Sequence, residues 1–323
     1  MQYGLLRADV RGPKPEFRPD PPGHLIACYS RPPDEKLEGE KFALSSHEQL
    51  VPVAFSLAAA LCWGTSDFSG GYASRRSDSF LVTTLSHAGG FVLMLSLALA
   101  THPDLPSRAS QLWAAAAGAS GGLALLLFYR ALSQGMGLAA PVAAVLGAAI
   151  PAAVTIIAHG LLGRLGLAGF LLAGIGIWLI SRPDGSGNTG GVFIAALAGI
   201  GFAGFFLCIS RTGESSPIWS AVFSRVASLL LVAMIALSRR LKGRLLRSDA
   251  TVAIFAGCLD VTGTALFIRA NQTGRLDSVV VLSSLYPALT VLLARIFLKE
   301  QFTYWKTAGI LAAVAAVPLI ALQ

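Results

Sequence analysis

The stretch FYRALSQG at residues 128–135 returns as FIRANQTG at residues 267–274, with four of the eight positions identical at a shift of 139. Further matches at nearly the same shift are Ser86-His87 with Ser224-Arg225, and Trp63 with Phe202. After the aligned prolines Pro151 and Pro287 the shift falls to 136, and a slip of three residues suits a loop or a kink. An offset that stays constant over successive segments indicates that the chain is an internal duplication.

The composition indicates an integral membrane protein. Hydrophobic residues make up 54% of the chain and charged residues 13%, with a mean hydropathy of +0.66, whereas soluble domains carry about 25% charged residues. Ten stretches approach the roughly 20 apolar residues that cross the hydrocarbon as a helix. They cover approximately residues 52–72, 79–100, 111–132, 138–158, 165–181, 191–210, 217–237, 251–270, 278–298 and 303–322. Helices are expected because a backbone in lipid must satisfy its own hydrogen bonds, and barrel strands would alternate polar with apolar residues.

We therefore predict an all-α integral membrane fold of about ten transmembrane helices, arranged as two five-helix repeats at residues 51–182 and 190–323. A repeat with an odd number of spans must enter the membrane from the opposite side in its second copy. The two repeats are therefore expected to be inverted with respect to each other.

Residues 1–50 have a different composition, with seven prolines, seven Lys or Arg and eight Asp or Glu. They contain no apolar run long enough for a signal peptide, and we predict a disordered, solvated tail. The net charge of +8 then resides in the membrane part. Five basic residues crowd one connection: Arg239, Arg240, Lys242, Arg244 and Arg247. A basic loop beside a helix reports orientation or contact with anionic lipid, so nucleic acid is not an expected partner.

We expect no cofactor and no metal site. Cys28 lies in the tail, and three cysteines without ligand spacing lie inside predicted spans: Cys62, Cys208 and Cys258. They are expected to be small core residues. The pattern GxGxxG at residues 199–204 lies inside an apolar span, without the preceding strand and the later acidic residue of a dinucleotide site. Close helix packing explains these glycines better.

The candidate functional residues are ionisable groups at membrane depth, since each costs about 2.5–3.5 kcal/mol at a helix centre. Asp260 is almost at the midpoint of the eighth span, and Arg225 is about 3 Å from the midpoint of the seventh. His87 is central in the second span, and Asp67 is about 6 Å past the midpoint of the first. Trp63 is the one tryptophan in the middle of a predicted span.

Two interpretations of these residues stay open. Asp260 and Arg225 lie at similar depth on consecutive antiparallel helices, so a buried structural ion pair accounts for them. A charged pair that faces a central cavity, as a substrate or proton site, accounts for them equally well. Asp67 suits either a role at a helix end or a role in a pathway, and His87 suits either hydrogen-bonded packing or a place in that pathway.

The chain resembles the drug/metabolite transporter superfamily, in particular its EamA-type members, over about residues 52–323. The similar features are two five-helix halves, the tripeptide CWG in the first span, Arg225 in the second helix of its half, and the stretch YPALTVLLARIFLKEQFTYWKTAGILAAVAAV near the end. In the second half Pro287, Glu300 and Gly309 match the family pattern, as Pro151 and Gly174 do in the first. The first half departs from the pattern at two positions: Arg164 replaces a glutamate and His87 replaces the commoner arginine.

The resemblance implies a secondary carrier that moves a small metabolite by alternating access, with its site in a central cavity between the halves. An amino acid or related compound is the first expectation, with export and proton coupling through Asp260 and Asp67. Sugar nucleotides, lipid-linked compounds and drug-like compounds are the alternatives. A membrane-embedded enzyme is a competing class, although the sequence contains no HExxH, no Ser/His/Asp arrangement and no carboxylate cluster. A non-transporting scaffold or sensor is a third class, which flux in sealed vesicles would separate from a carrier.

We expect a multi-pass protein of the cell (plasma or inner) membrane, whose partners are a small-molecule substrate, the lipid bilayer and protons. The resemblance implies that both termini are cytoplasmic. In that orientation the short loops carry roughly ten Lys or Arg outside and five inside, whereas positive charge normally concentrates on the cytoplasmic side. The two indications of orientation therefore conflict.

Overall fold

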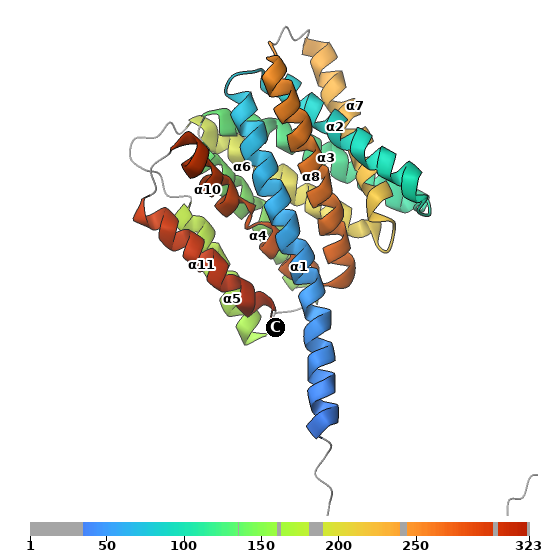
Figure 1. Ribbon diagram of the computed structural model, residues 1–323, viewed down its shortest axis with the longest axis vertical. Coiled ribbons are helices and arrows are strands. Elements are labelled where there is room, and N and C mark those ends of the chain that lie inside the picture. Colours follow the sequence, from blue (N-terminus) through green and yellow to red (C-terminus); the bar gives the residue numbers. More distant parts are fainter. Residues whose placement is uncertain are drawn as a thin grey trace, which may run out of the picture. The chain divides into compact units, whose positions relative to one another are not determined.

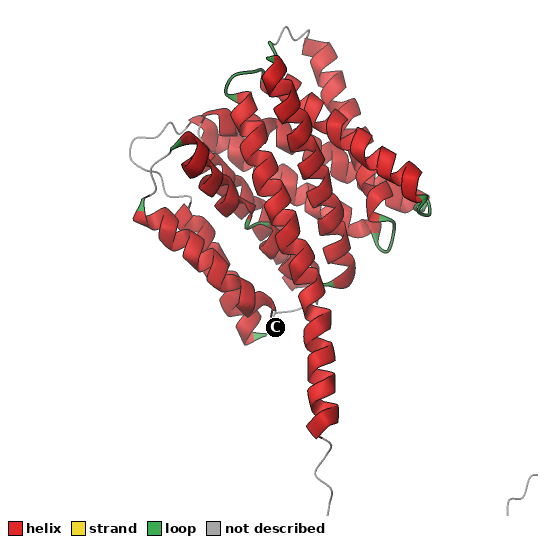
Figure 2. Ribbon diagram, viewed as in Figure 1, coloured by secondary structure: helices red, strands yellow, loops and turns green. Residues whose placement is uncertain are grey.

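A computed structural model describes residues 35–134, 136–159, 163–180, 190–239, 244–299 and 303–321. Every regular element in these ranges is helical (Figure 2). The elements are α1 (Glu35–Ser74), α2 (Ser79–Thr101), α3 (Arg108–Gln134), α4 (Met136–His159), α5 (Arg164–Ile180), α6 (Gly190–Ile209), the 3₁₀ turn η1 (Ser210–Thr212), α7 (Pro217–Arg239), α8 (Arg247–Thr273), α9 (Leu276–Ser283), α10 (Tyr286–Leu298) and α11 (Tyr304–Ala321). Of two compact units, Met1–Lys41 and Phe42–Gln323, the second holds the helical bundle.

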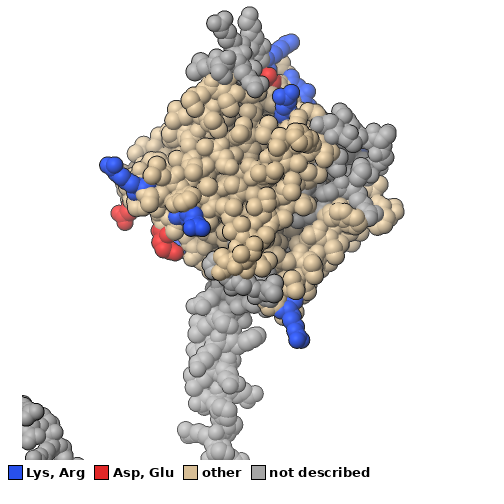
Figure 3. Space-filling model, turned by 180° about the vertical axis from the view of Figure 1, so that it is seen from behind, with Lys and Arg blue, Asp and Glu red and all other residues tan. Residues whose placement is uncertain are grey.

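Seven helical segments among the described residues are long and apolar enough to cross a membrane. They are Leu50–Ser74, Ser79–Thr101, Arg108–Gln134, Gly191–Thr212, Pro217–Ile235, Arg247–Thr273 and Leu276–Leu298. Two shorter apolar segments, Val142–Ala158 within α4 and Arg164–Gly176 within α5, lie in the region of the predicted fourth and fifth spans. Much of the face in Figure 3 is uncharged, with Lys, Arg, Asp and Glu in small groups toward its edges. The all-α membrane class is thus confirmed, while ten crossings and inverted repeats stay predictions.

α1 begins earlier than the sequence analysis predicts. Residues 35–50, assigned to the disordered tail, are helical in the structure, and residues 1–34 lie outside the described residues. The composition explains the difference, because this segment contains no proline and is rich in Glu, Lys and Leu, which have high helix propensity.

The predicted ninth span, residues 278–298, is two helices rather than one. α9 ends at Ser283, and α10 begins at Tyr286 with Pro287 in its first turn. Proline has no N–H to continue the helical ladder from the preceding turn, but it is well accommodated where a helix starts. The aligned Pro151 instead lies inside the continuous helix α4, so the kink expected at the register slip occurs in one copy only.

Small residues set the closest helix contacts. α2 packs against α7 and α8, α3 against α6 and α7, α4 against α6, and α5 against α11 (Figure 1). A Cβ atom on Gly118 of α3 would lie 1.9 Å from the carbonyl oxygen of Ser224 on α7. A Cβ atom on Gly257 of α8 would lie 1.8 Å from the carbonyl oxygen of Ser86 on α2. Both contacts therefore require glycine, and the two glycines are 139 positions apart while the two serines are 138 apart.

The GxGxxG pattern of α6 serves the same purpose. A Cβ atom on Gly199 would lie 2.7 Å from the carbonyl oxygen of Ala143 on α4, and one on Gly201 would lie 2.8 Å from Ala124 Cβ on α3. The Ser120 hydroxyl of α3 also donates to the Gly201 carbonyl at 2.8 Å. These contacts confirm the interpretation of the glycines as helix packing.

Candidate functional site

A buried polar cluster joins α2, α7 and α8 in the middle of their lengths. Arg225 Nη2 lies 2.5 Å from Asp260 Oδ2 and donates to Thr264 Oγ1 at 3.2 Å. Arg225 Nη1 lies 2.9 Å from His87 Nδ1. Because a guanidinium can only donate, Nδ1 of His87 must accept in this contact and carries no proton. The ion pair expected from the depth of the two charges is therefore present, with His87 as an additional partner.

A cavity lies beside this cluster. Its wall includes residues of α1, α3, α6, α7, α8 and α10, and its empty space is about 510 Å³, including the part that opens outward. Three charged residues line it: Asp67, Arg225 and Asp260. His87 is 1% exposed and contacts Arg225 from behind the wall.

Asp67 contributes a carboxylate without a counter-charge. It follows Trp63 by one helical turn on α1, so the two side chains share the helix face that meets the cavity. The residue is 5% exposed. No hydrogen bond or ion pair joins its carboxylate to another of the described residues. The sequence singled out Asp67 by depth but contained no signal that it would be unpaired.

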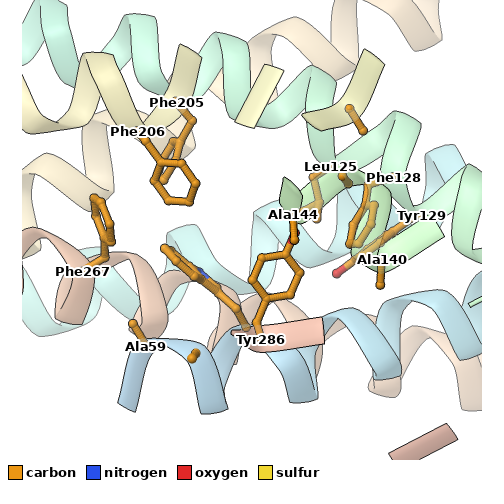
Figure 4. Packing of buried hydrophobic residues seen from close by; sticks show 14 of the residues in the cluster. Ala59, Leu125, Phe128, Tyr129, Ala140, Ala144, Phe205, Phe206, Phe267 and Tyr286 are labelled. Carbon is orange, nitrogen blue, oxygen red and sulfur yellow. The ribbon is translucent and has the colours of Figure 1, made fainter. Parts of the chain in front are cut away.

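Aromatic rings form much of the cavity wall. The Trp63 ring centroid lies 5.7 Å from that of Phe206 and 6.4 Å from that of Phe205. The Trp63 indole Nε1 donates to the Asp260 carbonyl at 3.1 Å, which fixes the ring next to the ion pair. Figure 4 shows Phe205, Phe206 and Phe267 on one side of the cluster and the ring of Tyr286 facing the Phe128 region. The Tyr286 and Phe128 centroids are 6.4 Å apart.

The other predicted residues lie away from the cavity wall or outside the described chain. Pro151 is buried inside α4, and Pro287 is buried in the first turn of α10, next to the lining residue Tyr286. Glu300 lies outside the described residues. Over the part of the chain that the structure describes, no three His, Cys, Asp or Glu side chains are grouped to hold a metal ion.

A second polar cluster, which sequence reasoning missed, closes one end of the bundle. Asp249, at the start of α8, is fully buried, pairs with Arg76 and accepts from the Ser77 hydroxyl at 2.7 Å. Ser77 Oγ accepts from the Leu246 amide at 3.1 Å, and the Asp78 amide donates to the Arg244 carbonyl at 3.0 Å. The connection between α1 and α2 is thus tied to the connection between α7 and α8. We refer to Arg76, Ser77 and Asp249 as the Asp249 latch.

The opposite end of the same helices is held by different contacts. Ser110, which is 139 positions before Asp249, donates to the Thr212 carbonyl at 3.1 Å. Gln272 Nε2 donates to the Gly213 and Ser215 carbonyls at 2.9 and 2.7 Å. Nearby, hydrogen bonds to Asp277 raise the pKa of Arg275 above its ordinary value. No ion pair equivalent to Arg76–Asp249 joins the connections at this end among the described residues.

Comparisons with known proteins find two relatives and a solved structure of similar fold. The chain is 26% identical over 281 residues to an uncharacterized transporter of Archaeoglobus fulgidus, covering 84% of this chain and 99% of the relative. It is 29% identical over 137 residues to an uncharacterized protein of Methanocaldococcus jannaschii, covering 41% of this chain and 94% of the relative. A solved crystal structure with 18% identity superposes with a TM-score of 0.68 over 84% of this chain and 98% of that chain, a likeness that shows the fold alone.

The second half of the chain matches a family model. Residues 189–322 match the EamA-like transporter family. This range runs from α6 to α11 and includes Arg225 and Asp260 of the buried pair. Over residues 189–322 the chain is therefore similar to the EamA-like transporter family, and its apolar helices are those of a multi-pass membrane protein.

Proposed function

We propose that this chain is a secondary carrier that moves a small metabolite across the cell membrane by alternating access. The observation that carries the proposal is the cavity itself, which places Asp67, Arg225 and Asp260 around one space inside the apolar bundle. Ionisable groups at membrane depth are costly, and where they line a cavity they mark substrate or ion pathways. The polar hydroxyl of Thr264 and the aromatic wall complete a site with few oriented polar groups and a large apolar surface.

The helix contacts support an inverted pair of five-helix halves. α2 packs on α8 as α3 packs on α7, and the contacts of Gly257 with Ser86 and of Gly118 with Ser224 are equivalent under the repeat shift. The cavity takes Trp63 and Asp67 from the first half, and Phe206, Arg225 and Asp260 from the second. A site at the interface of inverted repeats can be exposed alternately when one half rocks against the other.

An amino acid or related metabolite is the proposed cargo, and the plasma or inner membrane is the proposed location. Export and proton coupling through Asp67 and Asp260 belong to the same proposal. The transporter family of the second half and the transporter among the relatives favour a non-enzymatic role.

Flux in proteoliposomes tests this proposal. Liposomes containing the purified full chain should accumulate or release members of a pooled set of labelled amino acids and related metabolites faster than protein-free liposomes. Asp260→Asn protein, reconstituted to the same density, should lose this flux. An imposed proton gradient should change the rate if protons are coupled, and a protonophore should remove that change. Equal release from full-chain and protein-free liposomes across the whole pool would contradict the carrier function.

A further inference from the structure

We propose that the cavity recognises an organic cation, with Asp67 as the counter-charge of a cargo ammonium or guanidinium group and the aromatic wall around its apolar part. This inference deepens the proposed function and rests on the cavity being its site. Within the proposed class of amino acids and related metabolites, it selects amines that lack the carboxylate of an amino acid.

The charge balance of the cavity is the first argument. Arg225 and Asp260 neutralise each other at 2.5 Å. His87 adds no charge, because its Nδ1 accepts from Arg225. Asp67 remains, nine-tenths or more buried and without a partner among the described residues. An isolated charge removed from water is very unfavourable, so such a carboxyl is either protonated or paired with a positive group. In the cargo-bound state the cargo supplies that positive group.

The positive group of the cavity is largely occupied by partners within the bundle. Arg225 already contacts Asp260, His87 and Thr264, and its Nε, which has no partner among the described residues, is fully buried. The start of α10 reaches the cavity at Tyr286 but offers few free amide donors, because Pro287 has none and the Ala288 amide donates to the Leu285 carbonyl at 3.0 Å. A carboxylate or phosphate on the cargo would therefore meet Asp67 without gaining a free cation.

The wall favours an organic cation over a metal ion. Trp63, Phe205, Phe206 and Tyr286 present rings to the same space as Asp67, and ring faces attract ammonium and guanidinium groups. Hard metal ions need several oxygen ligands, and the described chain has no cluster of three or more His, Cys, Asp or Glu that could bind one. An amine with an apolar body matches both the carboxylate and the rings.

Equilibrium binding to the purified full chain in lipid nanodiscs tests the inference with four probes of similar size. They are 2-phenylethylamine, which is a cation at pH 7, phenylacetate, which is an anion, 2-phenylethanol, which is neutral, and phenylalanine, which is a zwitterion. Calorimetric titration should show the amine bound at least about tenfold more tightly than the other three, as expected for one charge-assisted hydrogen bond. Asp67→Asn should weaken amine binding to the level of the alcohol and leave alcohol binding unchanged.

Two further variants distinguish the loss of the Asp67 charge from a folding defect. Asp67→Glu keeps the charge and should retain most of the amine binding. Asp104→Asn removes a carboxylate from the exposed connection between α2 and α3 and should bind like the unmodified chain. Amine binding that survives in Asp67→Asn, no amine binding in the millimolar range, or equal binding of phenylacetate or phenylalanine would overturn the inference.

Flux separates this inference from the carrier proposal. Asp67-dependent amine binding without flux of any compound would support the cation site and contradict the carrier. Flux of anionic or neutral compounds, without Asp67-dependent amine binding, would support the carrier and overturn the cation site.

Discussion

At the scale of single residues, the pair of Arg225 and Asp260 offers a direct test of structure against function. Asp260→Asn leaves a guanidinium that is 6% exposed without its counter-charge, and breaking one partner of a buried pair destabilises a protein by about 3–5 kcal/mol. We expect a lower melting temperature in detergent and no flux. The double variant Arg225→Met with Asp260→Leu should regain much of the stability, since buried pairs exchange with packed apolar residues at little cost. It should not regain flux, and recovered flux would show that the pair is structural only.

The glycines at the helix crossings give a second prediction at this scale. Gly257→Ala must push α2 away from α8, because the new Cβ atom would overlap the Ser86 carbonyl oxygen at 1.8 Å. We expect a loss of about 1–3 kcal/mol in unfolding free energy, typical of overpacking, and a similar loss for Gly118→Ala. Gly174→Ala on α5 is the matched control, since nothing lies within 4 Å of its Cβ position, and it should be neutral or more stable by up to about 1 kcal/mol. A melting temperature for Gly257→Ala equal to that of the unmodified chain would contradict the close contact.

Depth in the membrane identified Arg225 and Asp260 from the sequence, but it did not identify Asp249. Arg225 and Asp260 could be found because charge at a helix centre is costly and their helices are consecutive. The pairing of His87 with Arg225 follows from the same depth, but depth alone does not fix which rotamers meet. Asp249 lies two residues from the start of α8, where a carboxylate normally reaches water at little cost. Its complete burial depends on loop geometry that sequence periodicity does not contain.

At the scale of elements, the Asp249 latch makes the two ends of the bundle unequal. Asp249→Asn should weaken the contact with Arg76 and the hydrogen bond from Ser77. Because Arg76 is 40% exposed, water screens much of its attraction to Asp249. The larger loss of local stability should therefore come from the buried hydrogen bond between Ser77 and Asp249. We expect faster hydrogen exchange in residues 72–82 and 244–252, measured by mass spectrometry on the full chain in nanodiscs.

Ser110→Ala is the control for the latch, because it removes the neutral hydrogen bonds of the Ser110 hydroxyl with Thr212 and Ser107 at the repeat-equivalent position. It should raise exchange near residues 107–112 and 210–216 by a smaller factor and leave residues 72–82 unchanged. Equal hydrogen-exchange rates of residues 72–82 in the unmodified chain and in Asp249→Asn would mean that the latch does not stabilise these connections.

The break between α9 and α10 shows what the repeat comparison could predict about elements. The register slip beside Pro287 indicated a loop or kink, and the structure has two turn residues there. The same slip beside Pro151 leaves α4 continuous. A proline inside a membrane helix is tolerated when neighbours or local adjustment satisfy the freed carbonyl, so sequence spacing cannot decide which copy breaks.

At the scale of the whole molecule, composition predicted the all-α membrane class because such apolar segments have no other stable structure in lipid. It could not decide how many segments cross. α4 has 24 residues, enough to cross, whereas α5 has 17, and a perpendicular crossing takes about 20. Shorter helices cross only where the bilayer thins or partners bury their ends. The inverted repeat requires both to cross, since only then do five spans separate the connection after α1 from the connection after α6.

Cysteine labelling at these two connections tests that requirement. Arg75 and Glu214 are exposed in equivalent connections, after α1 and η1 respectively. With the native cysteines replaced by serine, Arg75→Cys and Glu214→Cys should react with a membrane-impermeant maleimide from opposite sides of the membrane. The family orientation places Arg75→Cys outside, where intact cells are labelled, and Glu214→Cys should react only after permeabilisation. The distribution of Lys and Arg favours the reverse assignment, but in either orientation the two sites differ. Labelling of both cysteines from the same side would mean that an even number of spans lies between them, and the halves would then share one orientation.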